Sequence, residues 1–192
     1  MADFRKAFDH TMRHEGSYSN DPDDAGAETY RGISRRFFPD WIGWEFIDKA
    51  KLVAGFPASI PDDVLNNVVR THYKQHFWNR FWGDHIPSQM IAEEMFDTGV
   101  NMGVGRAVKY MQTGLNCLNR NEKLYDDLVV DGAFGRNTVN ALKEYLERDD
   151  QKPLLIIMNV LQGMHYIDYM KESPIQEKYA RGWLQRVSLN KD

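Results

Sequence analysis

The chain has 192 residues, of which 42% are hydrophobic and 12% aromatic, enough for one well-packed domain or two small ones sharing a core. Charged residues make up 27%, with no long single-sign run outside 21–24, which argues against a disordered chain. The formal net charge of −4 gives no electrostatic reason to expect nucleic-acid binding. The one cysteine, Cys117, cannot form an intramolecular disulfide and is expected to be a small buried hydrophobe.

The chain is expected to begin with an amphipathic helix followed by a hairpin. Apolar residues recur there at helical spacing in one stripe: Phe4, Ala7, Phe8, Thr11 and Met12. Gly16 is expected to end this helix. The polar segment 17–31 contains Asn-Asp-Pro and Ala-Gly-Ala, turn signals that favour a small irregular hairpin over a helix.

Most of the remaining chain is also expected to be helical. Apolar periodicity and helix-start signals predict helices at 40–54, 61–77, 88–98, 106–118 and 137–147, and a long helix after Pro153. Polar residues interrupt the last of these, which indicates a buried core helix and not a membrane span. The fold class is therefore expected to be all-α and mainly helical, with a small irregular hairpin or loop after the first helix.

Two regions of the chain are distinguished by composition and motifs, although no repeat or low-complexity linker separates them. The change falls near residue 95, so residues 1–95 and 96–192 are interpreted as two regions packed as one compact unit. The N-terminus, MADFRKAFDH, has no apolar stretch of signal-peptide type. We therefore expect synthesis in the cytoplasm without a signal peptide.

One carboxylate falls on the apolar face of the first expected helix. Glu15 lies eleven residues beyond Phe4, at nearly the same angular position on the helix. Loss of water and the negative helix end would both raise the pKa of this carboxyl. A proton retained near neutral pH is what a general acid needs to protonate a glycosidic oxygen. The alternative is a structural carboxylate paired with an arginine or capping a loop amide.

A second carboxylate and a hydroxyl follow in the expected hairpin. Asp24 lies nine residues beyond Glu15, and Thr29 five residues beyond Asp24, so a short hairpin can bring both back towards the helix end. A pair of carboxylates supports either stereochemical route of glycoside hydrolysis, depending on whether a water fits between them.

The order of these residues is similar to a known catalytic signature. In this chain a Glu is followed after eight residues by an Asp, after four more by a Thr, and then by Gly-Ile. This order resembles the catalytic signature of phage-type lysozymes, whose Thr usually comes one position later. The stretch from Glu15 to Ile33 looks more specifically like glycoside hydrolase family 108, with its EGGY and NDPxDxGGxTxxGI motifs. Ser17 and Ala27 replace two glycines of this pattern, and neither change removes a catalytic group.

The resemblance extends over nearly the entire chain. It continues through FWNRFWGDHIP at 77–87 and FDTGVNMG at 96–103. Beyond these, DGAFGRNT at 131–138 and GWLQRV at 182–187 look like the predicted peptidoglycan-binding region that accompanies the family.

The resemblance implies a lysozyme-like N-acetylmuramidase that acts on peptidoglycan glycan strands. It would cleave the β-1,4 bond between N-acetylmuramic acid and N-acetylglucosamine, without a metal or organic cofactor. Glu15 would donate the proton, Asp24 would stabilise charge or activate water, and Thr29 would position a water.

The resemblance also implies a route to the substrate. Some members are labelled putative secretion activators and travel without a signal peptide, with the help of a holin-type membrane protein. Action at the cell wall or periplasm after holin-assisted release is therefore expected, as for a bacterial or phage endolysin.

Several further residues are candidates for sugar contacts. Tyr18 and Tyr30 flank the polar turn, can stack on saccharide rings, and have Asn20 nearby as a polar contact. Asp97 and Asn101 share one edge of a helix, where they can line a sugar cleft or simply face solvent. Two other aromatics that can offer flat faces are Trp78, for which core packing is favoured, and Trp82.

Three rival functions stay open. A lytic transglycosylase needs one Glu and no second carboxylate, and a non-catalytic glycan-binding or secretion-accessory protein does not need Glu15. A metallohydrolase is suggested by two HxxxH pairs with zinc-site spacing: His10 with His14, and His72 with His76. These pairs lack the HExxH glutamate, and histidines hydrogen-bonded in the core are favoured over metal ligands.

Overall fold

The computed structural model describes residues 1–12, 17–20 and 28–187. The chain folds as two compact units, one made of residues 1–7 with the chain from residue 77 onward, the other of residues 8–76. Helix α1, Phe4–Met12, contributes residues to both units. Ala7, Phe8 and Thr11 are buried on this helix while the polar residues between them are exposed, which confirms the predicted apolar stripe.

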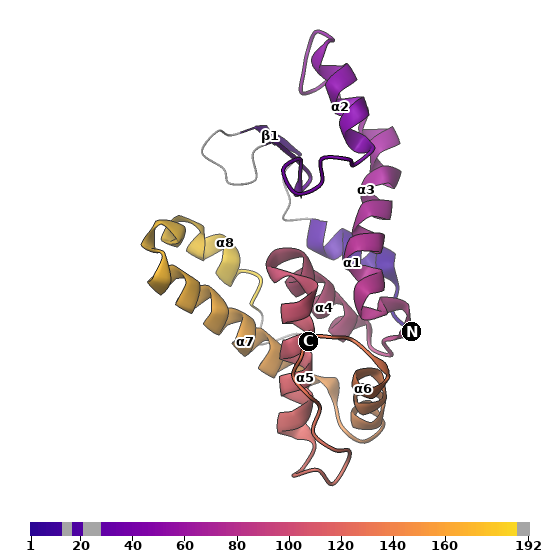
Figure 1. Cartoon of the computed structure of the whole chain (residues 1–192), viewed down its shortest axis with the longest axis vertical. Coiled ribbons are helices and arrows are strands. Elements are labelled where there is room, and N and C mark those ends of the chain that lie inside the picture. The colour runs from indigo at the N-terminus through magenta and orange to yellow at the C-terminus, as the bar shows by residue number, and fades with distance from the viewer. Residues whose placement is uncertain (13–16, 21–27, 188–192) are drawn as a thin grey trace. The chain divides into compact units, whose positions relative to one another are not determined.

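The unit of residues 8–76 consists of a small sheet and two further helices (Figure 1). The sheet contains β1 (Tyr18–Asn20), β2 (Glu28–Tyr30) and β3 (Ile33–Ser34), all antiparallel. Helices α2 (Gly43–Lys51) and α3 (Asp62–His76) follow. The predicted hairpin and the predicted helix after Pro61 are both confirmed.

The turn between β2 and β3 adopts a left-handed backbone. Arg31 has a φ of 46° and Gly32 a φ of 77°. Two consecutive residues at positive φ form a mirror-image turn whose twist matches that of paired strands. Glycine adopts this conformation readily, whereas arginine does so at a cost.

The core of this unit brings the sheet, α2 and α3 together. Its buried apolar side chains are Tyr30, Ile33, Trp41, Trp44, Ile47, Leu65, Val69 and Tyr73. Three hydrogen bonds join the sheet region to α3: the Tyr30 hydroxyl donates to Asp62, the Tyr73 hydroxyl donates to the carbonyl of Arg31, and the Arg31 guanidinium donates to Asn66. The sheet is therefore held against α3 by both packing and hydrogen bonds.

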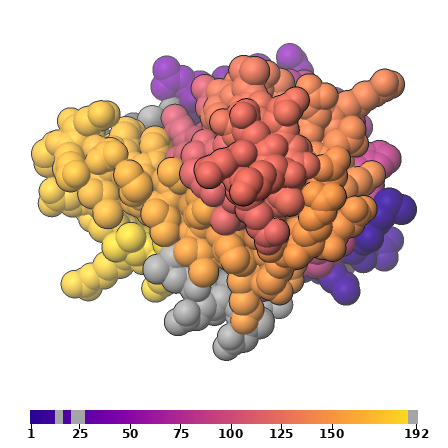
Figure 2. Space-filling view, turned by 90° about the horizontal axis from the view of Figure 1, so that it is seen from below, coloured from indigo at the N-terminus to yellow at the C-terminus, as the bar shows by residue number. Residues whose placement is uncertain are grey.

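The other unit is a helical assembly centred on α5. Its elements are the 3₁₀ helices η1 (Trp78–Phe81) and η2 (Gly83–His85), helices α4 (Gln89–Met102), α5 (Val104–Leu118), α6 (Arg136–Arg148) and α7 (Gln151–Glu172), then η3 (Pro174–Tyr179) and α8 (Ala180–Leu184). Helix α5 packs against α4, α6 and α7, and lies between α6 and α7 in Figure 1. Seen from below in Figure 2, α7 and α8 extend from this assembly to the left.

The long helix α7 carries polar side chains into the core. Asn159 and Gln162 are fully buried, and each amide nitrogen has a partner, the carbonyl of Leu155 at 3.0 Å and the hydroxyl of Thr98 at 3.3 Å. Hydrogen bonding offsets the cost of burying an amide. In the part of the chain that the structure describes, no helix is long and apolar enough to cross a membrane.

The mainly helical fold class with a small hairpin is confirmed. The division at residue 95 stays a prediction, and the compact units are bounded elsewhere, at residue 77. One expectation was wrong: Cys117 is exposed, because it lies on the outer side of α5, away from buried Met111 and Leu115.

Candidate active site

The register of the small sheet sorts the predicted site residues onto two faces. Ser19 pairs with Thr29, and Thr29 pairs with Ser34, so these three hydroxyl side chains share one face. Tyr18 pairs with Tyr30, which places both on the opposite face. Thr29 is half-buried, whereas Tyr30 is fully buried, so the hydroxyl face is the more accessible one at β2.

Tyr30 is held inside its unit by packing and by a hydrogen bond. Its ring stacks on Trp41 with centroids 6.1 Å apart, and its hydroxyl donates to Asp62 at 2.5 Å. Burial, with the Asp62 hydrogen bond, raises the pKa of Tyr30 far above its usual value. No face of this ring reaches solvent in the structure, and its contact with a sugar ring stays a prediction.

Tyr18 and Asn20 lie at the more open edge of the same face. The Tyr18 ring is half-buried and meets Phe56 edge-on, with centroids 4.8 Å apart. Burial and the nearby Glu28 carboxylate raise the pKa of the Tyr18 hydroxyl. Asn20 is exposed at the end of β1, opposite Glu28. These two side chains remain candidates for substrate contact.

Glu28 is a buried carboxylate that the sequence analysis did not single out. Lys51 Nζ lies 2.7 Å from Glu28 Oε1, and Arg35 Nη1 lies 3.2 Å from its other oxygen. Both cations also contact Asp48, at 3.1 Å and 2.8 Å. Although burial alone would lower the pKa of Lys51, the two carboxylates raise it. The sequence did contain a signal for this burial: in a strand, residues two apart point to the same face, so Glu28 shares the inward face of β2 with Tyr30.

Arg31 at the β2–β3 turn is fixed on three sides. Its amide donates to the carbonyl of Ser17 at 2.6 Å, and its carbonyl accepts from Tyr73 at 2.7 Å. Its guanidinium donates to the side-chain oxygen of Asn66. A non-glycine residue at positive φ persists only where its surroundings over-determine it, as these contacts do here.

Glu15 and Asp24 lie outside the residues that the structure describes, so their predicted pairing with Thr29 stays a prediction. Ser17, two residues beyond Glu15 in the sequence, immediately precedes β1, and its carbonyl accepts a hydrogen bond from the Arg31 amide. Thr29 lies on the neighbouring strand β2, opposite Ser19.

Asp97 and Asn101 come together on one edge of α4, in the unit from residue 77. Asn101 donates to the backbone carbonyl of Asp97 at 3.0 Å. The Asp97 carboxylate is mostly buried and lies 2.7 Å from Nη1 of Arg186, itself mostly buried. This pair gives Asp97 a structural partner, and its role in sugar binding stays a prediction.

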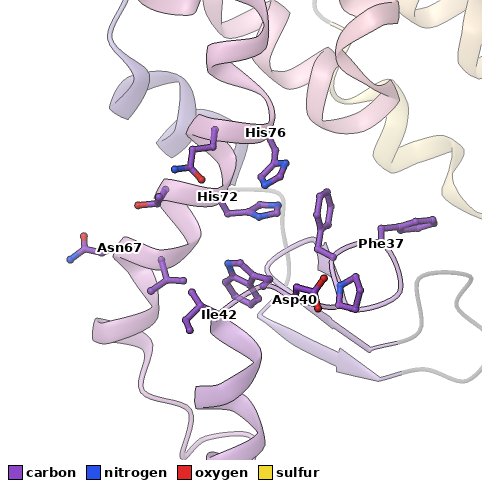
Figure 3. A pocket seen from close by; sticks show the side chains of 12 residues that line it. Phe37, Asp40, Ile42, Asn67, His72 and His76 are labelled. Atoms are coloured by element: carbon purple, nitrogen blue, oxygen red, sulfur yellow. The ribbon is translucent and has the colours of Figure 1, made fainter.

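A pocket of about 650 Å³ lies between α3 and the segment after β3 (Figure 3). His72 and His76 reach into it from α3, towards the segment that carries Phe37 and Asp40. The two imidazoles lie 4.4 Å apart between ring centroids, and both meet Phe38 edge-on. Within residues 1–12, 17–20 and 28–187, no cluster of three or more potential ligands is arranged to hold a metal.

The buried imidazole of His72 makes stability depend on pH. Burial, with the neighbouring His76, lowers the pKa of His72 from 6.5 to about 4. Between these values the unfolded chain binds a proton that the folded chain does not, so the free energy of unfolding falls as pH falls. We expect this residue to account for a loss of about 2 kcal/mol between pH 7 and pH 4.5.

The measurement is urea denaturation of wild type and His72→Gln at both pH values. The variant should lose less stability on acidification than wild type. The control is His10→Gln, because His10 is exposed on α1. An equal pH dependence in all three proteins would contradict the assignment.

Comparisons with known proteins agree with this architecture. Residues 8–103, half of the chain, match the family model of glycosyl hydrolase 108, and residues 106–188 match that of a predicted peptidoglycan domain. Among solved structures, SagA of Brucella abortus has a similar fold, with a TM-score of 0.61 and 22% identity over 96% of this chain and 88% of that chain. No curated protein matches the chain. The chain therefore belongs to glycosyl hydrolase family 108, as a glycoside hydrolase with a peptidoglycan-binding region.

Proposed function

We propose that this glycoside hydrolase is an N-acetylmuramidase, which cleaves the β-1,4 bond between N-acetylmuramic acid and N-acetylglucosamine. The match to glycosyl hydrolase 108 spans the segment from Glu15 to Thr29. The peptidoglycan domain matched at 106–188 supports peptidoglycan as the substrate.

The observation that carries the proposal is the hydroxyl face of the small sheet. Ser19 is exposed and Thr29 half-buried, and they lie side by side on the face opposite the buried Tyr30, a face that the buried Ser34 continues on β3. Hydroxyl groups both donate and accept hydrogen bonds, as sugar hydroxyls and water do. A substrate lying across this face would meet the Thr29 side chain.

In the proposed reaction, Glu15 donates a proton to the glycosidic oxygen as the bond to the leaving sugar breaks. Asp24 stabilises the positive charge that develops on the remaining sugar, or activates the attacking water. Thr29 holds that water by a hydrogen bond from its side chain. No step of this reaction requires a metal ion or an organic cofactor.

Replacing Glu15 tests the proposed acid. Glu15→Gln keeps the size of the side chain but cannot donate the proton, so digestion of purified peptidoglycan should slow by at least about a hundredfold. Glu45→Gln, which changes an exposed carboxylate on α2, should digest at the wild-type rate. Activity is followed by loss of turbidity, and products are identified by mass.

The products separate the rival mechanisms. Hydrolytic reducing ends on N-acetylmuramic acid support a muramidase, whereas 1,6-anhydro ends would identify a lytic transglycosylase. Equal digestion by Glu15→Gln and wild type would refute the assignment of Glu15. Loss of wild-type activity with a chelator would favour a metallohydrolase.

Replacing Thr29 tests the water-positioning role. Thr29→Val keeps the branched shape that suits a strand but removes the hydroxyl, so kcat should fall about tenfold with KM little changed. Thr29→Ser should restore most of the rate. Thr71→Val, which removes the hydroxyl of an exposed threonine on α3, serves as the matched control and should leave kcat unchanged. A rise in KM alone would show that Thr29 only binds substrate.

We also propose that the protein acts at the cell wall or periplasm after holin-assisted release. The support is the location of the substrate, since peptidoglycan lies outside the cytoplasmic membrane. Cell fractionation should recover the protein with the wall when a holin-type protein is present, and in the cytoplasm when it is deleted. Wall association without that partner would contradict this route.

A further inference from the structure

Trp82 differs from the other aromatic residues of its segment, FWNRFWGDHIP. Trp78 and Phe81 are fully buried, whereas 40% of Trp82 is exposed. Trp82 also has a φ of 51°, in the left-handed region that bulky residues rarely adopt. Strained residues of this kind cluster at binding and catalytic sites, so an exposed and strained tryptophan requires an explanation.

The packing of Trp78 enforces the conformation next to Trp82. A Cβ atom on Gly83 would lie 2.3 Å from the Trp78 ring, so only glycine fits there. The Trp78 indole donates to Asp84 Oδ1 at 2.8 Å, which fixes the residues beyond. The amide of His85 donates to the carbonyl of Trp82 at 2.7 Å. Trp82 is thus held outward by well-packed neighbours on both sides.

The Trp82 ring makes two T-shaped ring contacts, and no described ring stacks parallel to it. Phe134 and His85 both meet it edge-on, with centroids 6.0 Å and 6.4 Å away and ring planes crossing at 72°. Phe134 belongs to the DGAFG motif of the peptidoglycan domain match, and Trp82 to the family 108 match. Both motifs therefore contribute to one local structure within the unit from residue 77.

A polar pocket lies beside the ring. It has a volume of about 330 Å³ and is lined by Asn79, Trp82, Gly83, Asp84 and His85. This volume is at the lower end of the range for small-ligand sites. The side chains of Asn79 and His85 make no hydrogen bond within the described part of the chain, and both are exposed. They are available to a ligand.

We propose that Trp82 and this pocket bind one N-acetylhexosamine ring of the glycan strand, at a site within the unit from residue 77. The apolar face of the sugar packs on the indole, and its hydroxyl and acetamido groups bond to Asn79 and His85. A flat apolar surface beside the polar side chains of Asn79 and His85 suits a sugar ring, and the pocket lining includes the Asp84 carboxylate but no lysine or arginine, so it does not favour an anion. This site depends on the proposed function only in one respect: its ligand is assumed to be the glycan strand of peptidoglycan.

The test is binding of chitotetraose, a soluble tetramer of N-acetylglucosamine, measured by calorimetry. It is made in the Glu15→Gln background, where turnover is expected to be lost. Trp82→Gly should weaken binding about tenfold, because it removes the stacking surface. Trp82→Tyr keeps a flat ring and should stay within about threefold of the parent. Phe37→Ala removes an even more exposed ring from the other unit and should have no effect.

Folding is checked separately. Glycine adopts a φ of 51° without strain, so the melting temperature of Trp82→Gly should stay close to that of the parent. A second probe, glycan strands freed of stem peptides by an amidase, should show the same ranking of variants in co-sedimentation.

Each outcome bears on the site independently of the catalytic assignment. Weakened binding in a folded Trp82→Gly supports the site, whether or not Glu15→Gln retains activity. Equal chitotetraose binding by Trp82→Gly and the parent overturns the site and leaves the role of Glu15 untouched. Binding only to strands that keep their stem peptides also overturns it, because the ligand would then be peptide.

Discussion

The left-handed turn at Arg31 and Gly32 is the constraint on which the small sheet depends. Strands of two or three residues contribute few ladder hydrogen bonds, so the turn and its anchors must set the register. Bonds to Ser17 and Tyr73 hold the turn, and Tyr73 belongs to α3, 42 residues further along the chain. A shift of the β2 register by one residue would turn Thr29 inward and move Tyr30 and Glu28 to the opposite face.

The same register explains why Glu28 is buried with its charge. Its strand position faces inward beside Tyr30, where Lys51 and Arg35 supply the opposite charge. Removing one partner of a buried pair leaves an uncompensated charge, so this cluster ties the sheet firmly to α2. Among the described carboxylates of the sheet region, Glu28 is therefore structural.

The helices could be predicted from local signals, whereas the details of the site could not. The Ser88 side chain caps α4 by accepting a hydrogen bond from the amide of Ile91, three residues later. A helix start of this kind can be predicted from the local sequence. In contrast, the strain at Arg31 depends on Tyr73, which no local pattern links to it. Trp78 and Trp82 are four residues apart, a spacing that would place both on one face of a helix. However, η1 ends at Phe81, and the left-handed backbone at Trp82 leaves the Trp82 ring exposed at the surface. Burial of Trp78 was predictable, and exposure of Trp82 was not.

The regions matched by the two family models share one core from residue 77 onward. Helix α4 falls in the family 108 match, yet it packs against α5 and α7 of the peptidoglycan domain match. The Asp97–Arg186 pair and the hydrogen bond between Thr98 and Gln162 join the same two regions through mostly buried groups. Separating the two matched regions would leave the polar side chains of these pairs either buried without partners or exposed beside apolar neighbours. The peptidoglycan-binding region is thus folded together with α4, and the same shared core brings Phe134 against Trp82, the residue proposed to bind a sugar ring.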